Sequence, residues 1–378
     1  MHEKTADARL AIGASELDAD LYYLTRFRAP DAFVYIEVGG RSTLLMSDLE
    51  IDRARTQARV DEVLSLSAYE EKAKQQNITG APAGLGAVLA LLQERGAKSV
   101  EVPSGFAVRS ADFLRDQGLD LSYPEGAYVV ERELKSESEI DHIREVQQAT
   151  EDAMDVALTA LRQADVEDGV LVTDGRPLTA EDIKKGIALL LLDRGITAKN
   201  TIVACGDQAC DPHNEGSGPL CADQPIVIDI FPRSDETGYY ADITRTVIKG
   251  EPTKKQVALY KTVLEAQMSA LDHIAAGVDG KEIHDAVNDR FIAAGFETGE
   301  VDGRMQGFFH GTGHGLGLEI HEPPRITRSS QTLKAGHVVT VEPGLYYPGL
   351  GGVRIEDLVV VTENGCENLT RYPKEFQL

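Results

Sequence analysis

The sequence has no run of eighteen or more apolar residues, which argues against a membrane-spanning helix. Its longest apolar stretch, residues 186–196, is interrupted by Asp193 and Arg194 and is typical of a helix with one buried face. The N-terminus lacks a positively charged segment followed by an apolar one, so we expect no signal peptide and a cytoplasmic protein. With 378 residues, the chain is long enough for two domains, each with its own core.

Cysteine is scarce. The four cysteines show neither C-x-x-C spacing nor the density of a disulfide-stabilised secreted protein: Cys205, Cys210, Cys221 and Cys366. We therefore expect buried free thiols. A structural zinc site is the alternative, and the number of cysteines alone does not exclude a disulfide.

Basic residues are outnumbered, with 38 Lys and Arg against 62 Asp and Glu and a formal net charge of −24. A surface this negative repels phosphate backbones and anionic lipids, so we expect neither nucleic acid nor a membrane as a partner. The same excess allows some carboxylates to be held together by bound cations.

Residues 1–130 have the pattern of an α/β domain. Two apolar runs, residues 32–40 and 42–48, predict strands that turn at two successive glycines. The segments 83–100 and 102–123 each predict a helix followed by a strand. This alternation indicates a mixed or parallel sheet flanked by helices.

Residues 131–378 have a different pattern. At the boundary, near residues 131–140, Ser136 and Glu139 form an S-x-x-E capping box that predicts a helix continuing to about Arg162. Further helices are expected at 179–195, 253–277 and 279–295, and strands at 201–205, 225–231, 239–249, 338–344 and 353–362. Helices that cluster away from a mostly antiparallel sheet make this an α+β domain.

Two aspartates interrupt apolar strands. Asp229 and Asp242 are thirteen residues apart, an odd separation that would place them directly opposite each other on one face of a hairpin. Carboxylates that close repel each other unless a proton or a cation lies between them. The pair therefore favours a metal site, whereas a single buried acid would more often be a hydrogen-bonded structural residue.

Two glutamates repeat this pattern. Glu342 and Glu356 each end or interrupt an apolar strand. Arg354, two residues before Glu356, would project from the same face and could orient a bridging carboxylate or a substrate group. A buried Arg–Glu ion pair is the structural alternative.

The tract HGTGHGLGLEIHEPP, residues 310–324, combines three histidines with alternating glycines. The glycines are incompatible with a stable helix and permit close approach of a backbone or ligand in an extended segment. Four acids and one imidazole suit a pair of Mn²⁺, Co²⁺, Fe²⁺ or Zn²⁺ ions. Such a pair activates water, and the remaining histidines would donate protons or stabilise an oxyanion.

Residues 310–322 and the order of the acidic positions resemble the pita-bread metallopeptidases, in particular the branch that contains Xaa-Pro dipeptidase (prolidase) and aminopeptidase P. The resemblance covers about residues 131–365. It implies a pita-bread catalytic domain at residues 131–378, preceded by a smaller α/β domain of the creatinase type at residues 1–130, which would serve in dimerisation and closure of the substrate site.

The resemblance also implies roles for individual residues. Asp242 and Glu356 would bridge two metal ions, Asp229 would bind one ion, and His314 with Glu342 would bind the other. Glu342 would in addition accept the proton of the attacking water.

Four further residues match substrate or catalytic positions of the branch. His321 would lie near the scissile carbonyl, and His310 and Arg354 would line the pocket for the proline ring. His213 would contact substrate and shuttle a proton, although a histidine of an ordinary surface loop is the alternative.

One departure concerns the spacing of the aspartates, which is eleven in the branch and thirteen here. The extra residues fall in the turn at residues 232–238, and because their number is even the two side chains should still share a face. Asp235 could replace Asp229 as a ligand but lies among turn residues.

The implied reaction is hydrolysis of an Xaa–Pro bond at the N-terminus of a small peptide, with manganese as the first candidate metal and Co²⁺, Zn²⁺ or Fe²⁺ as alternatives. Aminopeptidase P activity on longer peptides is the alternative to dipeptidase activity. In a homodimer, Asp31 and Arg41 from the partner could close the pocket and limit it to dipeptides, unless they are ordinary loop charges.

Three other protein types share the fold: methionine aminopeptidases, creatinases that have lost metal ligands, and non-catalytic interaction proteins. The large N-terminal domain and the complete histidine signature argue against the first. The five intact ligand positions argue against the other two.

Overall fold

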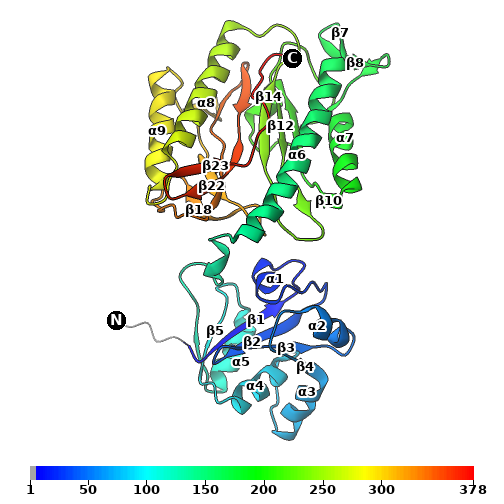
Figure 1. Cartoon of the computed structure of the whole chain (residues 1–378), viewed down its shortest axis with the longest axis vertical. Coiled ribbons are helices and arrows are strands. Elements are labelled where there is room, and N and C mark those ends of the chain that lie inside the picture. Colours follow the sequence, from blue (N-terminus) through cyan, green and yellow to red (C-terminus); the bar gives the residue numbers. More distant parts are fainter. Residues whose placement is uncertain (1–5) are drawn as a thin grey trace. The chain divides into compact units, whose positions relative to one another are not determined.

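The computed structural model describes residues 6–378, so the first five residues of the expected N-terminal domain lie outside the described residues (Figure 1). The chain divides into two compact units, Met1–Arg132 and Glu133–Leu378.

The first unit is built on a six-stranded mixed sheet with strand order β4-β3-β2-β1-β5-β6. The turn predicted at Gly39-Gly40 is confirmed, since Val38 pairs with Arg41 in an antiparallel hairpin, whereas β4, β5 and β6 join their neighbours in parallel. The elements are β1 (Ala8–Gly13), α1 (Ala19–Thr25), β2 (Phe33–Val38), β3 (Arg41–Met46), α2 (Ile51–Gln57), β4 (Glu62–Ser65), α3 (Leu66–Gln75), α4 (Leu85–Glu94), β5 (Ser99–Glu101), α5 (Val108–Asp116), β6 (Asp120–Ser122) and the 3₁₀ turn η1 (Val130–Arg132).

Alternating side chains of this sheet form a core on each face. Leu10 and Ile36 pack with α4 and α5 on one face, and their neighbours Ala11 and Tyr35 pack with α1 and α2 on the other. Successive strand residues point to opposite faces, so a sheet covered on both sides needs apolar residues at nearly every position. This explains the uninterrupted apolar runs in the sequence.

The second unit is α+β, with neighbouring strands antiparallel in its main sheets, β11-β12-β14 and β18-β17-β19-β22-β23. The capping box predicted at Ser136 is confirmed: the Glu139 carboxylate accepts hydrogen bonds from the backbone N–H and hydroxyl of Ser136. The helices are α6 (Glu137–Gln163), α7 (Ala180–Asp193), α8 (Lys254–His273) and α9 (Gly280–Ala293), with the 3₁₀ turn η2 (Gly206–Cys210).

The strands of this unit are β7 (Asp165–Glu167), β8 (Val170–Thr173), β9 (Arg176–Pro177), β10 (Ile196–Thr197), β11 (Ile202–Cys205), β12 (Ile226–Ile230), β13 (Arg233–Ser234), β14 (Ile243–Val247), β15 (Gly299–Val301), β16 (Arg304–Gln306), β17 (Gly313–Gly315), β18 (Glu322–Ile326), β19 (Val338–Val341), β20 (Gly344–Tyr347), β21 (Gly351–Arg354), β22 (Asp357–Thr362) and β23 (Gly365–Asn368).

Two helix pairs cover the strands of the second unit (Figure 1). Helices α6 and α7 share a core with β11, β12 and β14, and α8 and α9 share another with β19 and β22. The outer faces of the strands are thus sealed by helices, which leaves their other faces to carry polar side chains.

Two strand predictions need correction. The segment 353–362 is not one strand, because the chain breaks at Ile355 and Glu356 between β21 and β22. Asp242 does not interrupt a strand either, since it lies immediately before β14. Asp242 therefore lies where a strand begins, and Glu356 lies in the break between two strands.

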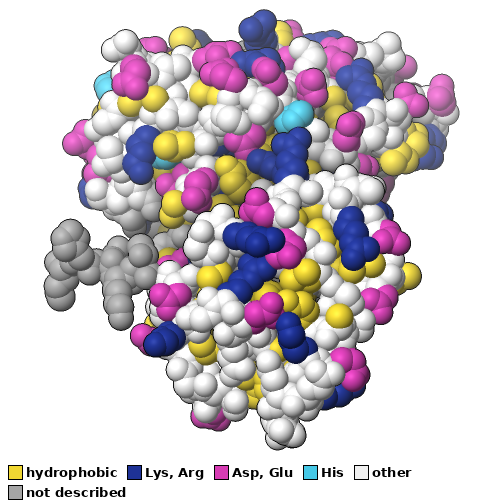
Figure 2. Space-filling view, turned by 60° about the horizontal axis from the view of Figure 1, so that its bottom comes forward, with side chains coloured by type: hydrophobic (Ala, Val, Ile, Leu, Met, Phe, Trp, Pro, Cys, Tyr) yellow, Lys and Arg dark blue, Asp and Glu magenta, His cyan; other side chains and the backbone are white. Residues whose placement is uncertain are grey.

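The four cysteines are free within the described part of the chain; Cys210 is buried and the other three are half-buried. Among residues 6–378, the helices are all too short or too polar to span a bilayer. On the face drawn in Figure 2, acidic side chains are interspersed with Lys and Arg, so the negative charge is not gathered into one patch there.

Gly313 of β17 has no room for a side chain, because a Cβ there would lie 1.9 Å from the backbone oxygen of Thr340. Replacing Gly313 by Ala should therefore lower the free energy of unfolding by about 1–3 kcal/mol or more through overpacking, measured as a lower urea midpoint. Gly365→Ala is the control, since nothing lies within 4 Å of a Cβ at that position. Equal midpoints for the two variants would contradict the close packing of β17.

Candidate metal centre

Five polar side chains meet inside the second unit, although the sequence spreads them over more than a hundred residues. Each comes from a strand or a strand end: β12, the residue before β14, β17, the residue after β19, and the break between β21 and β22. Four are buried, and the fifth, Glu342, is half-buried. They are Asp229, Asp242, His314, Glu342 and Glu356.

The two aspartates share a face, as their odd separation predicts, but they are not directly opposed. In the β12–β14 pairing, Asp229 lies opposite Thr244, and Asp242 precedes Thr244 by two residues. The aspartates are therefore diagonal neighbours. The turn between them explains the difference, because its residues Arg233 and Ser234 form β13 and pair with β10.

Asp235, the alternative ligand in that turn, lies elsewhere. It is exposed and accepts a hydrogen bond from the Thr197 hydroxyl at 2.8 Å. The two-residue-longer turn is thus engaged with β10 and leaves the carboxylate pair undisturbed.

His314 presents a single nitrogen to the carboxylates. Its Nδ1 lies 3.1 Å from the Gly315 carbonyl oxygen, so Nδ1 carries the proton and donates it there. Its Nε2 lies 3.3 Å from a Glu342 oxygen and 3.8 Å from an Asp242 oxygen. Burial, reinforced by His321, lowers the pKa of His314 to about 3, which makes the ring neutral, with a lone pair directed at two carboxylates.

Burial and mutual repulsion raise the pKa values of several of these carboxyl groups. Burial raises the pKa of Asp242 and of Glu356 well above the usual range, and neighbouring carboxylates raise both further. Burial likewise raises the pKa of Glu342 to about 7. These groups cannot all be charged together without a nearby positive charge.

The donor set fits divalent cations. One oxygen each of Asp229 and Asp242 is buried without a hydrogen-bond partner among residues 6–378. Ligand atoms of Asp242, His314 and Glu356 lie within 4.8 Å of one another. Carboxylate oxygens with one imidazole nitrogen form a hard site of the kind that Mn²⁺, Fe²⁺, Co²⁺ and Zn²⁺ accept.

Arg354 contacts Asp229, not a glutamate, so the Arg–Glu alternative is wrong. Its Nη2 donates to Asp229 at 2.6 Å, and its Nε donates to the Thr244 hydroxyl at 3.2 Å. That hydroxyl in turn donates to Glu356 at 2.6 Å. One buried guanidinium thus fixes two of the four acids but leaves most of their charge unbalanced.

Tyr346 links Arg354 to His310. The sequence does not predict this role for Tyr346. Its hydroxyl lies 2.9 Å from His310 Nε2 and 3.0 Å from Arg354 Nη1. Gly344 makes this possible, because a Cβ there would lie 2.4 Å from the same hydroxyl. The only sequence signal was the position of Tyr346 between two glutamates already singled out.

The remaining histidines lie at the edge of the cluster. His321 is exposed, and its ring centroid is 4.4 Å from that of His314. His213 is exposed in a turn, where its backbone N–H donates to the Asp211 side chain. Besides burial, His213 contributes to the lowered pKa of His310 and of His321, so it lies within electrostatic reach of both.

Asp31 and Arg41 belong to the first unit. Both are exposed; Asp31 precedes β2, and Arg41 begins β3 with its Nη2 3.3 Å from Glu62. The five-residue cluster described above consists of residues of the second unit alone.

Removing the charge of Glu342 should stabilise the metal-free protein in a pH-dependent way. Because the pKa of Glu342 is raised from 4.5 to about 7, its stabilising contribution is complete below about pH 4.5 and is lost as the pH rises through 7. Metal-free Glu342→Gln should match wild type near pH 5 and exceed it at pH 8 by up to about 3 kcal/mol, since one pKa unit corresponds to about 1.4 kcal/mol.

Thermal and urea unfolding at both pH values measure this difference. The control is Glu363→Gln, which changes an exposed glutamate and should give no pH-dependent difference. A metal-free Glu342→Gln protein that is less stable than wild type at pH 8 would show that Glu342 is stably ionised in the fold.

Comparison with known proteins agrees with this geometry. Residues 141–363 match metallopeptidase family M24. The Xaa-Pro dipeptidase of Pyrococcus furiosus is 41% identical over 181 residues, which cover 47% of this chain and 49% of that protein, so the chain spans about half the length of such curated relatives.

Solved structures resemble the chain over nearly its whole length. An Xaa-Pro dipeptidase from Bacillus anthracis superposes with a TM-score of 0.81 at 26% identity, over 99% of this chain and 95% of that one. An X-Pro aminopeptidase from Thermotoga maritima gives 0.80 at 25% identity, over 99% and 98%. The chain belongs to metallopeptidase family M24, and its second unit has the pita-bread fold of that family.

Proposed function

We propose that this protein is a metal-dependent Xaa-Pro dipeptidase, a prolidase. The observation that carries the proposal is the meeting of four carboxylates and the neutral His314 beside a second group that contains His310, Tyr346 and Arg354. The first group suits a pair of divalent ions, and the second would receive the substrate.

The proposed ligand roles are those that the resemblance to the pita-bread metallopeptidases implies. Asp242 and Glu356, whose pKa values burial and neighbouring carboxylates raise well above the usual range, would bridge the two ions. Asp229, held by Arg354, would bind one ion, and His314 with the adjacent Glu342 would bind the other. Manganese is the first candidate, and Co²⁺, Zn²⁺ and Fe²⁺ suit the same donors.

When bound, two divalent ions lower the pKa of water and polarise a carbonyl group. The chain's own residues handle the protons. Glu342, with a pKa raised to about 7, would take the proton that the attacking water loses. His321, exposed beside His314, would stabilise the oxyanion, and His213 would carry the proton to the leaving nitrogen.

A preference for proline has a physical basis. An Xaa–Pro bond has no N–H, so a peptidase that pairs with the substrate amide binds it poorly. Here, His310 lies among aromatic rings, 5.2 Å from Phe308 and 5.4 Å from Tyr346 between centroids. An apolar wall of this kind accepts a pyrrolidine ring without requiring an amide donor.

Restriction to dipeptides would come from the first unit of a partner subunit. In a homodimer, Arg41 could bind the carboxylate that follows proline, with Asp31 closing the pocket. Aminopeptidase P activity is the alternative. It is supported by the superposition on the X-Pro aminopeptidase of Thermotoga maritima, whose TM-score of 0.80 is close to the 0.81 for the Xaa-Pro dipeptidase of Bacillus anthracis. Free thiols are compatible with the proposed cytoplasmic location.

Loss of a bridging carboxylate should abolish hydrolysis. Asp242→Ala and Glu356→Ala should show no detectable hydrolysis of Gly-Pro and should bind less metal. His321→Ala should keep its metal but lose about 10²–10³-fold in kcat, the usual effect of removing one oxyanion donor.

Metal analysis and Gly-Pro kinetics with Mn²⁺ measure both effects. Asp235→Ala is the matched control, because it removes an exposed aspartate from the turn between the two ligand strands. Wild-type turnover in Asp242→Ala would remove the basis of the proposal.

Chain length should matter to the substrate. We expect kcat/KM for Gly-Pro to exceed kcat/KM for Gly-Pro-Leu. Arg41→Ala should weaken dipeptide binding and so reduce the ratio of the two kcat/KM values. Arg55→Ala, another exposed arginine of the first unit, should have no effect. Equal values for both peptides in wild type would instead assign aminopeptidase P activity.

A further inference from the structure

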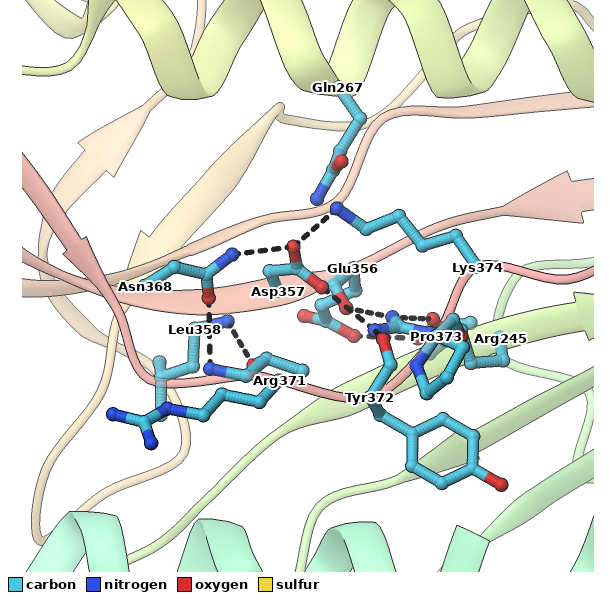
Figure 3. Close-up of polar contacts among 12 residues, drawn as sticks. Arg245, Gln267, Glu356, Asp357, Leu358, Asn368, Arg371, Tyr372, Pro373 and Lys374 are labelled. Carbon is cyan, nitrogen blue, oxygen red and sulfur yellow. Dashed lines mark hydrogen bonds and ion pairs between the residues drawn. The ribbon is translucent and has the colours of Figure 1, made fainter. Parts of the chain in front are cut away.

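A second buried polar layer lies behind the ligand carboxylates, and the proposed chemistry does not use it (Figure 3). At its centre is Arg245 of β14, whose exposed fraction is 1%. A buried guanidinium needs partners for five N–H groups. Arg245 has five hydrogen bonds: to the carbonyl oxygens of Thr244, Glu356, Tyr372 and Pro373 and to the Asp357 carboxylate.

Three of these contacts join two separate parts of the chain. Its Nη1 donates to the backbone oxygen of Glu356 at 2.6 Å, and its Nη2 and Nε donate to the backbone oxygens of Tyr372 and Pro373 at 2.7 and 2.9 Å. Arg245 therefore joins the backbone of Glu356, which lies in the break between β21 and β22, to the C-terminal segment, residues 370–374.

Asp357, next to Glu356, anchors the same segment. This fully buried carboxylate accepts from Arg245 at 3.0 Å, from Lys374 at 2.6 Å and from Asn368 at 2.9 Å. The Asp357 carboxylate thus lies between two basic side chains, those of Arg245 and Lys374.

The other bridging carboxylate is tied to the same segment from helix α6. Gln147, fully buried, accepts the backbone N–H of Asp242 at 3.2 Å and donates to the Thr370 hydroxyl at 3.0 Å. The same hydroxyl accepts the backbone N–H of Leu358 at 2.8 Å. Residues 370–374 are thus connected, through one intervening side chain on each side, to the backbones of both Asp242 and Glu356.

We propose that Gln147, Arg245, Asp357, Thr370 and Lys374, here named the tail clamp, are positioning residues for the metal centre. Asp242 and Glu356 repel each other when both are ionised, and the clamp holds their backbones in place against this repulsion. The proposal rests on the proposed function, because it concerns the affinity of the same site. Groups that orient metal ligands typically change metal affinity by about 10- to 100-fold when removed.

The test compares Co²⁺ binding to metal-free full-length variants by calorimetry and visible absorption. Thr370→Val keeps the side-chain shape but removes both hydrogen bonds of the hydroxyl, and Lys374→Met removes one partner of Asp357. Arg245→Lys keeps the charge but not the five donors. We expect each variant to bind Co²⁺ about 10- to 100-fold more weakly than wild type, with altered visible absorption of the bound ion.

Two controls separate positioning from stability. Glu375→Gln breaks an exposed ion pair with Arg162 directly after residues 370–374, and this variant should bind Co²⁺ as wild type does. Val287→Ala removes buried methyl groups from the core beneath α9; it should lower the unfolding temperature but leave Co²⁺ affinity and absorption unchanged. If Arg245→Lys fails to fold, the Co²⁺ affinities of Thr370→Val and Lys374→Met test the proposal.

The outcomes are distinct. Wild-type protein that takes up no Co²⁺ would refute the proposed metal-dependent function. Wild-type protein that binds two ions, with clamp variants of equal affinity and absorption, would overturn the tail clamp alone. Weaker binding by Val287→Ala to the same extent would also overturn it, because the effect would then follow from general destabilisation.

Discussion

Repulsion among four carboxylates held in a protein interior is the constraint around which the second unit is organised. Burying an unpaired charge costs several kcal/mol, and here a single guanidinium, that of Arg354, lies among the four acids. The strands and the helices sealed against them prevent the acids from moving apart or turning to solvent. This confinement raises the pKa values of Asp242, Glu342 and Glu356, and a divalent cation bound there would favour their ionised forms.

Secondary structure and the chemical character of the site could be predicted from the sequence because their signals are local. The capping box at Ser136, the alternating glycines around His314 and the odd spacing of Asp229 and Asp242 each depend on residues close together in the chain. The odd separation of Asp229 and Asp242 predicts correctly that both side chains lie on the same face. The predicted direct pairing of the two is wrong by two residues, but a shift by two residues leaves the face unchanged.

What could not be predicted depends on residues that meet only after folding. The break at Glu356 arises because the chain leaves the β20–β21 hairpin to join β19, and nothing in the apolar run 353–362 signals it. Gln147 and Arg245 look like ordinary polar residues of a helix and a strand, and their partners lie 95 and more than 100 residues away. Single-sequence patterns carry no information on such pairs.

The extended turn between the aspartates bears on how such chains can diverge. Its residues form β13 and are secured by β10, so extra length there is absorbed outside the carboxylate cluster. A change in the length of this turn can therefore be accommodated without displacing either aspartate from the cluster.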